Sequence, residues 1–335
     1  MKRKGVIFLA FIYVLILLFA VCVSANVIVI NDDGESINMT SLFKAESFTS
    51  SKGTKINYRI YLPKDYSAEK EYPLILFLHG AGQAGSDNES QLKLGICEPF
   101  KNKSSEIYDC IVLAPQCPSG CKWVDVESWG DCKYDSEKIP ESAPLAAVVE
   151  LFNWAKTAYS VDKDRVYVTG LSMGGYGTWD LLVRHPDLFA AAMPLCGGAD
   201  YRKAELIKDI PIWTFHGKQD GVVPYQGTEK MANAIKELGG NCRFTLYPTM
   251  EHGIWPTVYA REDILPWLLS KKLSDRMEET TVLEEENTGL PEPSTESAEQ
   301  PAPKRSSCRS AVISAAPIAG AVAISAFVLK KKKDD

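Results

Sequence analysis

The stretch Y-V-T-G-L-S-M-G-G-Y-G at Tyr167–Gly177 is the strongest indication of the fold of this chain. An apolar, β-branched run, Val166–Thr169, leads into G-L-S-M-G and then into a helix-like stretch, Thr178–Val183. A G-x-S-x-G between a strand and a helix is typical of a sharp turn that strains the serine backbone and needs small residues on both sides. The alternative is a glycine-rich turn that happens to contain a serine. The strand–turn–helix setting favours Ser172 as a nucleophile whose hydroxyl projects above a sheet, at a helix N-terminus.

A serine hydroxyl needs a base to take its proton, and the base needs an acidic group to orient it. After a turn of this kind the usual chain order is serine, then Asp or Glu, then histidine. His252 is the expected base, because it lies on a loop beyond the strand-like run Phe244–Tyr247. His216 closes the apolar run Ile212–Phe215 and is the weaker alternative, expected to be buried. His185 is expected at a helix C-terminus.

Asp220 is the expected acid. It lies in K-Q-D-G, a turn after Ile212–Phe215, between the serine and the base in the chain. Most Asp-Gly pairs only shape a loop, but position and order favour Asp220 as the orienting carboxylate. Asp180 and Asp187 lie in or after the helix that follows the serine, and Asp209 lies at the opposite end of a strand.

The loop after Leu74–Leu78 is expected to help bind a tetrahedral oxyanion. That run is unbroken and apolar, as in a strand buried on both faces. It ends in H-G-A-G, and loops of this type supply a backbone donor. One N–H should come from Met173, next to the nucleophile, and the other from Ala81, with Gly82 as the next candidate. His79 is expected to brace the loop rather than to carry protons.

Strand-like and helix-like runs alternate along the core of the chain, which predicts a mostly parallel sheet with helices on both faces. Reactive groups then collect at the carboxyl ends of the strands. The composition is that of a globular domain, with 45% hydrophobic and 24% charged residues, and a net charge of −6 gives no sign of nucleic-acid binding. Strands are expected at Asn57–Leu62, Leu74–Leu78, Ile111–Ala114, Val166–Thr169, Ala191–Leu195, Ile212–Phe215 and Phe244–Tyr247, and helices at Ala143–Tyr159, Thr178–Val183 and Gly227–Leu238.

Several stretches match one family: Tyr58–Tyr66, Tyr72–Gly82, Gly85–Asn88, Ala114–Pro118, Val168–Trp179, His216–Pro224 and Glu251–Trp255. On these stretches the chain resembles the α/β-hydrolase "predicted peptidase" group, related to esterase D-like, polyhydroxyalkanoate-depolymerase-like and feruloyl-esterase-like proteins. The resemblance covers essentially the whole globular part of the chain. It implies an α/β-hydrolase fold and a serine hydrolase with Ser172, Asp220 and His252 as its triad. It does not imply peptide cleavage, since the characterised relatives are mostly esterases.

The N-terminus carries a targeting pattern. Lys2–Lys4 precede an apolar run, Val6–Val23, which ends in V-S-A. This predicts a secretory signal over residues 1–25, removed after Ala25. The run is long for a signal, so an uncleaved signal anchor is the alternative.

The C-terminus carries a second apolar segment. Residues 311–329 are nearly uncharged and are long enough, as a helix, to cross a bilayer. Lysines 330–333 follow, and the positive-inside rule keeps them cytoplasmic, which would place the hydrolase outside the cell. The sequence therefore predicts a transmembrane anchor with a cytoplasmic tail, 330–335. A merely sticky or amphipathic tail is the alternative, favoured by the many alanines and by Pro317.

The expected domain lies between these ends. Residues 26–50 are expected to form an N-terminal leader and residues 51–272 the catalytic domain. The segment 273–310 is rich in Glu, Pro, Ser and Thr and is expected to be a disordered acidic linker.

Cysteines and tryptophans gather in residues 97–132, which hold five of the seven cysteines of the expected exported part. Export would permit disulfides, so we expect a stapled loop over the site. A metal site is the alternative, but no histidine lies within the cluster and the spacing matches no common zinc pattern. Trp123, Trp129 and Trp255 are candidates for an apolar or sugar-stacking wall near the nucleophile, with plain core packing as an equal alternative.

Together these patterns predict an exported, membrane-tethered serine esterase that needs no cofactor or metal and has no nucleic-acid partner. Its substrate is expected to be an acyl or aryl ester, with polysaccharide-linked esters as candidates. A serine peptidase with the same groups is the nearest alternative, since the two differ in whether the leaving group must be protonated. A catalytically silent surface binding module is the other alternative, disfavoured because all three positions of the triad are filled.

Overall fold

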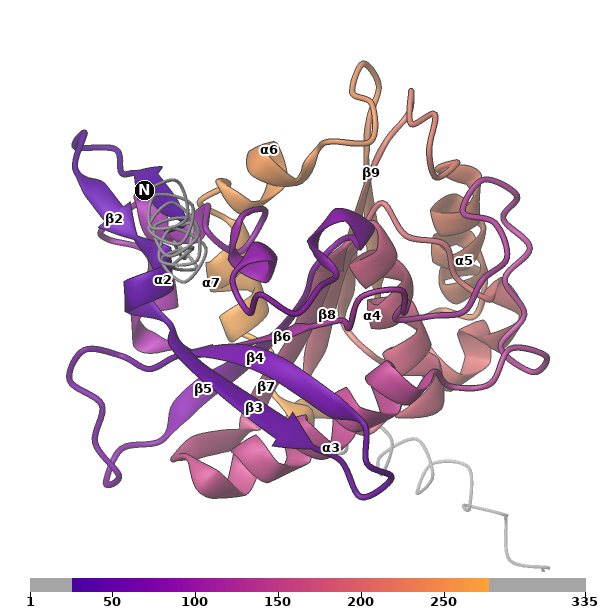
Figure 1. The fold of residues 1–335 in the computed structure, drawn as a ribbon. Coiled ribbons are helices and arrows are strands. Elements are labelled where there is room, and N and C mark those ends of the chain that lie inside the picture. The colour runs from indigo at the N-terminus through magenta and orange to yellow at the C-terminus, as the bar shows by residue number, and fades with distance from the viewer. Residues whose placement is uncertain (1–25, 277–335) are drawn as a thin grey trace, which may run out of the picture. The chain divides into compact units, whose positions relative to one another are not determined.

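The computed structural model describes residues 26–276 (Figure 1). An eight-stranded sheet runs through this part of the chain in the order β10-β9-β8-β7-β5-β6-β4-β3. Strands from β10 to β6 in this order are parallel to their neighbours, while β4 is antiparallel to β6 and β3 is antiparallel to β4. The strands of the sheet are β3 Lys44–Thr49, β4 Lys55–Tyr61, β5 Tyr72–Leu78, β6 Ile111–Gln116, β7 Val161–Leu171, β8 Ala191–Leu195, β9 Ile212–Gly217 and β10 Cys242–Tyr247.

The central strands are apolar on both faces, because both faces of the sheet are covered. On β5, Leu74, Leu76 and Leu78 join one hydrophobic core, while Ile75 and Phe77 join the other. The unbroken apolar run in the sequence is therefore two alternating sets of side chains, one for each core.

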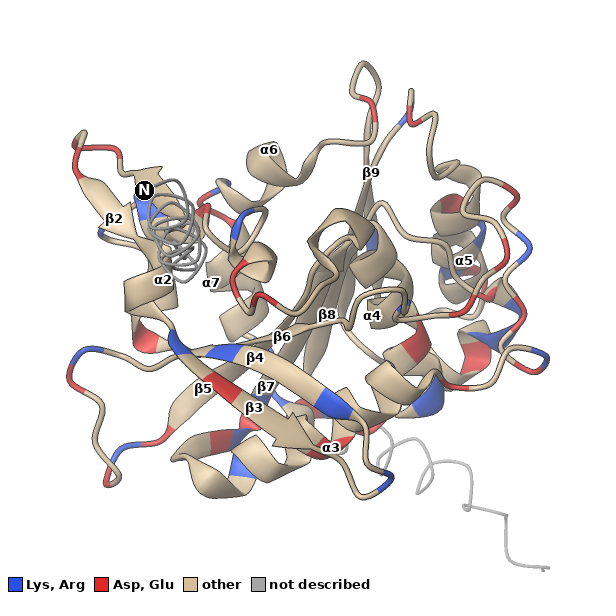
Figure 2. Ribbon diagram, in the orientation of Figure 1, with Lys and Arg blue, Asp and Glu red and all other residues tan. Residues whose placement is uncertain are grey.

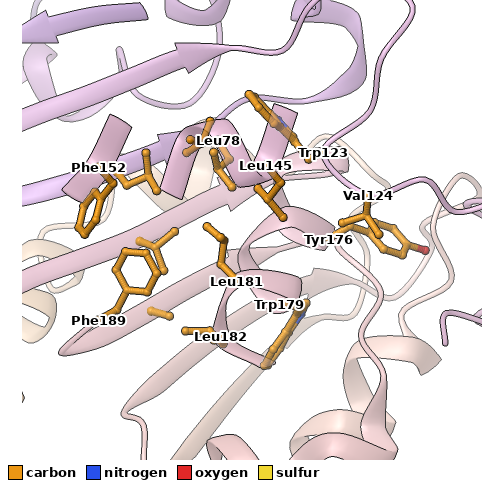
Figure 3. Close-up of a cluster of buried hydrophobic side chains, with 14 of the residues drawn as sticks. Leu78, Trp123, Val124, Leu145, Phe152, Tyr176, Trp179, Leu181, Leu182 and Phe189 are labelled. Atoms are coloured by element: carbon orange, nitrogen blue, oxygen red, sulfur yellow. The ribbon is translucent and has the colours of Figure 1, made fainter. Parts of the chain in front are cut away.

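Helices α3 Ala143–Ala158, α4 Met173–Arg184 and α5 Gln226–Glu237 supply side chains to the first core. Helices α6 Trp255–Tyr259 and α7 Ile264–Leu269 supply the second. Every residue of helix α4 from Met173 to Val183 is buried, so other parts of the chain cover this helix on all sides. Figure 3 shows its side chains among those of α3. Short 3-10 helices occupy the connections: η1 Ala81–Gln83, η2 Ser90–Leu92, η3 Pro99–Lys101, η4 Glu106–Asp109 and η5 Tyr201–Ile207.

The expected leader, residues 26–50, is part of the folded body, so the boundary at residue 51 is wrong. It forms a two-stranded sheet, β1 Ile28–Ile30 with β2 Ser36–Asn38, then helix α2 Met39–Leu42 and strand β3. The buried Arg59 of β4 holds this segment, because its guanidinium donates hydrogen bonds to the carbonyl oxygens of Thr40 and Phe43.

All seven predicted strands and all three predicted helices are present, and Ala191–Leu195 has the predicted ends. The largest shifts are at β7 and α4, which each begin five residues before the predicted start; α4 begins directly after the serine turn. At the other end, Ser274 hydrogen bonds Asp164 and Arg276 hydrogen bonds the Phe189 carbonyl, so the first residues of the expected linker lie on the domain.

The expected signal (1–25), anchor (311–329), tail (330–335) and most of the linker lie outside the described residues. From residue 26 to residue 276, no helix combines the length and the apolar character needed to cross a bilayer. In the view of Figure 2, acidic and basic residues are interspersed along the loops and helices of the described part of the chain.

Candidate active site

The serine turn joins β7 to α4 directly. Ser172 stands between Leu171, the last residue of the strand, and Met173, the first of the helix, with φ 55° and ψ −116°. A non-glycine residue with positive φ is strained, and such strain is frequent at functional turns. The flanking glycines are required by close backbone contacts, since a Cβ on Gly170 would lie 2.4 Å from the Gly174 carbonyl oxygen.

The structure brings the three expected site residues into one hydrogen-bonded chain. The Nε2 atom of His252 lies 2.8 Å from the Oγ atom of Ser172, and its Nδ1 atom lies 2.6 Å from Oδ2 of Asp220. Asp220 follows β9 and His252 follows β10, so both loops leave the carboxyl ends of neighbouring strands. A carboxylate accepts the Nδ1 proton, and this leaves Nε2 free to accept the serine proton.

Asp220 is held as a carboxylate. Burial alone would raise its pKa, but hydrogen bonds from His216 and His252 and from the backbone N–H groups of Val223 and Val222 lower the pKa below the usual value. The N–H groups of Val222 and Val223 donate to Oδ1 of Asp220, at 2.9 Å and 2.8 Å respectively. The orienting group therefore keeps its charge at neutral pH.

His216 is fully buried, as the sequence predicts, but its contact with Asp220 was not predicted. Its Nε2 atom lies 3.1 Å from Oδ2 of Asp220, the oxygen that also accepts from His252. The signal for this contact is the spacing H-x-x-x-D at the end of β9, which places two polar side chains around one tight turn.

The H-G-A-G loop lies beside the serine. A Cβ on Gly80 would lie 3.5 Å from the Cβ of Ser172. Ala81 begins η1 and Met173 begins α4, and the first N–H groups of a helix have no acceptor within that helix. Both predicted donors therefore start helices next to Ser172, whereas Gly82 is one position further along η1.

His79 braces this loop, as predicted. Its Nε2 atom accepts a hydrogen bond from the Cys117 N–H at 2.9 Å, and its Nδ1 atom lies 2.6 Å from the Gly80 carbonyl oxygen. Burial lowers the pKa of His79 to about 4, so the ring is neutral and can accept at Nε2. The Trp123 indole donates to the His79 carbonyl oxygen at 3.0 Å.

The three tryptophans have different environments. Trp123 is completely buried in the core near Leu78, so its placement in a substrate wall is wrong (Figure 3). Trp255 meets the His252 ring edge to face, with centroids 5.4 Å apart. Trp129 packs on Tyr176, one helical turn after Ser172, with centroids 4.9 Å apart.

The expected disulfide staple is wrong, because all seven cysteines of the described chain are free. Polar contacts hold the loop before α3 instead. Tyr134 hydrogen bonds the buried Asp180 of α4, and Arg184 donates to the carbonyl oxygens of Ser136 and Ile139. Several cysteines are core residues, which explains their presence without pairing: Cys97, Cys110, Cys117 and Cys196.

One group in the described part of the chain has the spacing of metal ligands, and it lies outside the predicted cysteine cluster. The ligand atoms of Cys196, His216 and Asp220 lie within 4.8 Å of one another. The imidazole and the carboxylate of this group are already hydrogen bonded to each other, and the carboxylate also binds His252. The ligand atoms of His216 and Asp220 are therefore already used in the hydrogen bonds between Asp220 and the two histidines.

A mostly parallel sheet covered on both faces, with a strained serine between β7 and α4, defines an α/β-hydrolase. Residues 65–261 match the phospholipase/carboxylesterase family. This chain belongs to that family, and it is a serine ester hydrolase.

Three relatives illustrate the similarity. The carboxylesterase SOBER1 of Arabidopsis thaliana is 29% identical over 196 residues, which cover 54% of this chain and 83% of that protein. The bifunctional acetylxylan esterase/xylanase XynS20E of Neocallimastix patriciarum is 25% identical over 181 residues, 53% of this chain and 23% of that protein. A solved thermostable esterase is 34% identical, with a TM-score of 0.62 over 73% of this chain and 70% of that one.

Proposed function

We propose that this protein hydrolyses carboxylic esters through an acyl-enzyme formed on Ser172. The observation that carries the proposal is the continuous chain of hydrogen bonds from Ser172 through His252 to Asp220. Ser172 Oγ attacks the ester carbonyl carbon while His252 Nε2 takes its proton, and Asp220 stabilises the imidazolium that results. The N–H groups of Met173 and Ala81 stabilise the oxyanion.

Collapse of the tetrahedral intermediate breaks the bond to the alkoxy oxygen, and the His252 imidazolium gives its proton to the leaving alcohol. A water molecule then attacks the acyl carbon with His252 again as base. The second collapse releases the carboxylic acid and returns the proton to Ser172. The groups named here account for every proton transferred.

The proposed substrates are acyl or aryl esters, including esters carried on polysaccharides. The partly exposed Trp255 ring beside His252 supports this proposal, because it offers an apolar surface next to the reacting centre. The similarity to a protein described as an acetylxylan esterase/xylanase gives independent support.

A fluorophosphonate probe tests the nucleophile. The wild type should be labelled and the Ser172→Ala variant should not, while Ser104→Ala, which changes an exposed serine on another loop, should label normally. Absence of wild-type labelling would favour the binding-module alternative. A substrate panel of p-nitrophenyl acyl esters, methyl ferulate, acetylxylan and short peptides then defines the reaction, and cleavage of peptides alone would contradict the esterase.

The proposed location is the outer face of a membrane, with the C-terminal segment as anchor. The sequence patterns at the two ends support it: an apolar N-terminal run after three basic residues, and the uncharged segment 311–329 before a basic tail. In cells, the full chain should fractionate with membranes and be degraded by added protease. Truncation before residue 311 should release active enzyme into the medium, and retention in the membrane would contradict the anchor.

A further inference from the structure

The side chain of Gln83 folds back from the end of the H-G-A-G loop towards the nucleophile. A Cβ on Gly80 would lie 3.2 Å from Oε1 of Gln83, 3.5 Å from the Cβ of Ser172 and 2.8 Å from Cδ1 of Leu171. The Gln83 amide and the Ser172 side chain therefore lie on either side of the bare Cα atom of Gly80. Ala81, whose N–H is the predicted oxyanion donor, is the next residue in the chain.

The Gln83 amide has no hydrogen-bond partner among residues 26–276, although the residue is half-buried and both of its backbone groups are paired. An amide that loses water without gaining a partner costs free energy. A bound ester that covers Gln83 must therefore supply that partner. Because neither amide atom is engaged, the group can turn about its last side-chain bond and present its NH2 without breaking a hydrogen bond.

The backbone of Gln83 is fixed in place. Its N–H donates to the Gly80 carbonyl oxygen at 3.1 Å, and its carbonyl oxygen accepts from Nε2 of Gln116 at 3.1 Å. The Gln116 side chain is buried and is itself held, because Nε2 also donates to Oδ1 of Asp87 at 2.6 Å and Oε1 accepts from the Asn88 N–H at 2.7 Å. The amide thus extends from a backbone that does not have to reorganise when a substrate reacts.

From this placement we propose that Gln83 is a third oxyanion donor, whose side-chain NH2 donates a hydrogen bond to the carbonyl oxygen of the reacting ester. The inference rests on the proposed function of Ser172 as the nucleophile. It adds a side-chain donor to the backbone N–H groups of Met173 and Ala81. Side-chain amides of Asn and Gln act as oxyanion donors in hydrolases of other folds.

The charge of the intermediate determines which amide atom faces the substrate. Attack by Ser172 Oγ turns the carbonyl oxygen into an oxyanion, which can only accept hydrogen bonds. The amide NH2 is attracted to this charge, whereas the amide oxygen is repelled by it. A hydrogen bond to a charged oxygen is stronger than one to the neutral ester, so Gln83 should raise kcat with little effect on KM.

Steady-state kinetics on p-nitrophenyl acetate give the first test. Gln83→Met keeps the length of the side chain but has no donor, so kcat should fall by about 10²-fold. An oxyanion forms in both acylation and deacylation, so both steps slow and KM should stay nearly constant. Gln226→Met, which changes an exposed glutamine at the start of α5, should behave as the wild type. An unchanged kcat in Gln83→Met, or a change confined to KM, would overturn the proposal.

A trifluoromethyl ketone gives the second test, because it forms a tetrahedral adduct with a serine hydroxyl without turnover. With ¹³C at the carbonyl carbon, NMR follows the pH at which the adduct oxygen takes up a proton. Loss of one hydrogen bond to the oxyanion should raise that value by about one to two pH units in Gln83→Met. A fall in kcat with an unmoved adduct titration would show that Gln83 only supports the loop, and this too would overturn the proposal.

The adduct also separates this inference from the proposed function. Its formation needs only the nucleophile, so a wild type that forms it but hydrolyses no ester would contradict the esterase and leave the Gln83 comparison intact. A wild type that forms no adduct would contradict Ser172 as the nucleophile, and the oxyanion donor with it. Urea unfolding checks that Gln83→Met keeps the wild-type stability, and Gln83→Leu replaces it in both measurements if it does not.

Discussion

A Cβ atom on Gly174 would lie 1.9 Å from the carbonyl oxygen of Leu78. The first turn of α4 is thus pressed against the end of β5, and this contact holds the nucleophile turn and the oxyanion loop together. The contact is with backbone, so no side chain can move aside.

We therefore expect Gly174→Ala to lower the free energy of unfolding by at least about 3 kcal/mol, at the upper end of what overpacking costs. Gly221→Ala is the matched control, since a Cβ there meets nothing within 4 Å. Urea unfolding of the two variants measures the difference. Equal stabilities would mean that the β5–α4 contact can relax.

Much of this site could be predicted from the sequence because its signals are local. The run Leu74–Leu78 is apolar without interruption because it serves two cores, and Gly170 is required by a contact within the turn itself. Asp220 and His252 follow strands β9 and β10, which can also be recognised from their own apolar residues. Parallel pairing of those strands then brings both loops to one edge of the sheet.

Features that depend on tertiary contacts could not be predicted. Strand β3 has the sequence K-A-E-S-F-T and lies at the sheet edge, so it shows no apolar run, and its place is set by pairing with β4. Trp123 lies in the core, where its indole N–H donates to the His79 carbonyl oxygen, and no sequence pattern reveals this contact. His216 contacts the Thr228 hydroxyl, which donates to the Gly197 carbonyl oxygen, and no sequence pattern reveals that these residues of β9, α5 and the segment after β8 meet.

The oxyanion donor at Ala81 can be removed by a proline. Ala81 is the first residue of η1, where proline is tolerated, and Gly80 has the extended conformation, φ −78° and ψ 172°, that a residue before proline prefers. Ala81→Pro should therefore fold normally but lose the N–H, with a fall in kcat of about 10²- to 10³-fold. Ala81→Gly keeps the N–H and should lose far less. Steady-state kinetics on a p-nitrophenyl ester measures kcat for both variants. Equal losses of kcat in Ala81→Pro and Ala81→Gly would argue against the Ala81 N–H as an oxyanion donor.

His79 should make stability depend on pH. Its pKa is lowered from 6.5 to about 4 by burial, so between these values the unfolded chain binds more protons than the folded one. Stability is then fully present above the unfolded value and falls as the pH drops towards 4, by up to about 3 kcal/mol. His79→Gln keeps an acceptor for the Cys117 N–H but does not titrate. The free energies of unfolding of the two proteins, measured across this range, should converge as the pH falls, and parallel curves would contradict the buried neutral imidazole.

Trp255 should affect both the base and the substrate. Its ring lies edge to face with His252 at 5.4 Å and is partly exposed, so it can contact an acyl or aryl group at the serine. Aromatic contacts of this kind are worth about 0.5–1.5 kcal/mol, which predicts a loss of about 2- to 13-fold in kcat/KM for esters of aromatic acids in Trp255→Ala. Acetyl esters, which are too small to cover the ring, should lose less.

The control for this variant is Trp154→Ala, because Trp154 on α3 packs on Phe48, at the edge of the sheet. It should change stability but leave the ratio of kcat/KM between aromatic-acid esters and acetyl esters unaltered. Kinetics on methyl ferulate and methyl acetate, which share the leaving group and differ in the acyl group, measures this ratio for each variant. If Trp255→Ala lowers kcat/KM for both substrates by the same factor, the ring only orients His252 and takes no part in substrate selection.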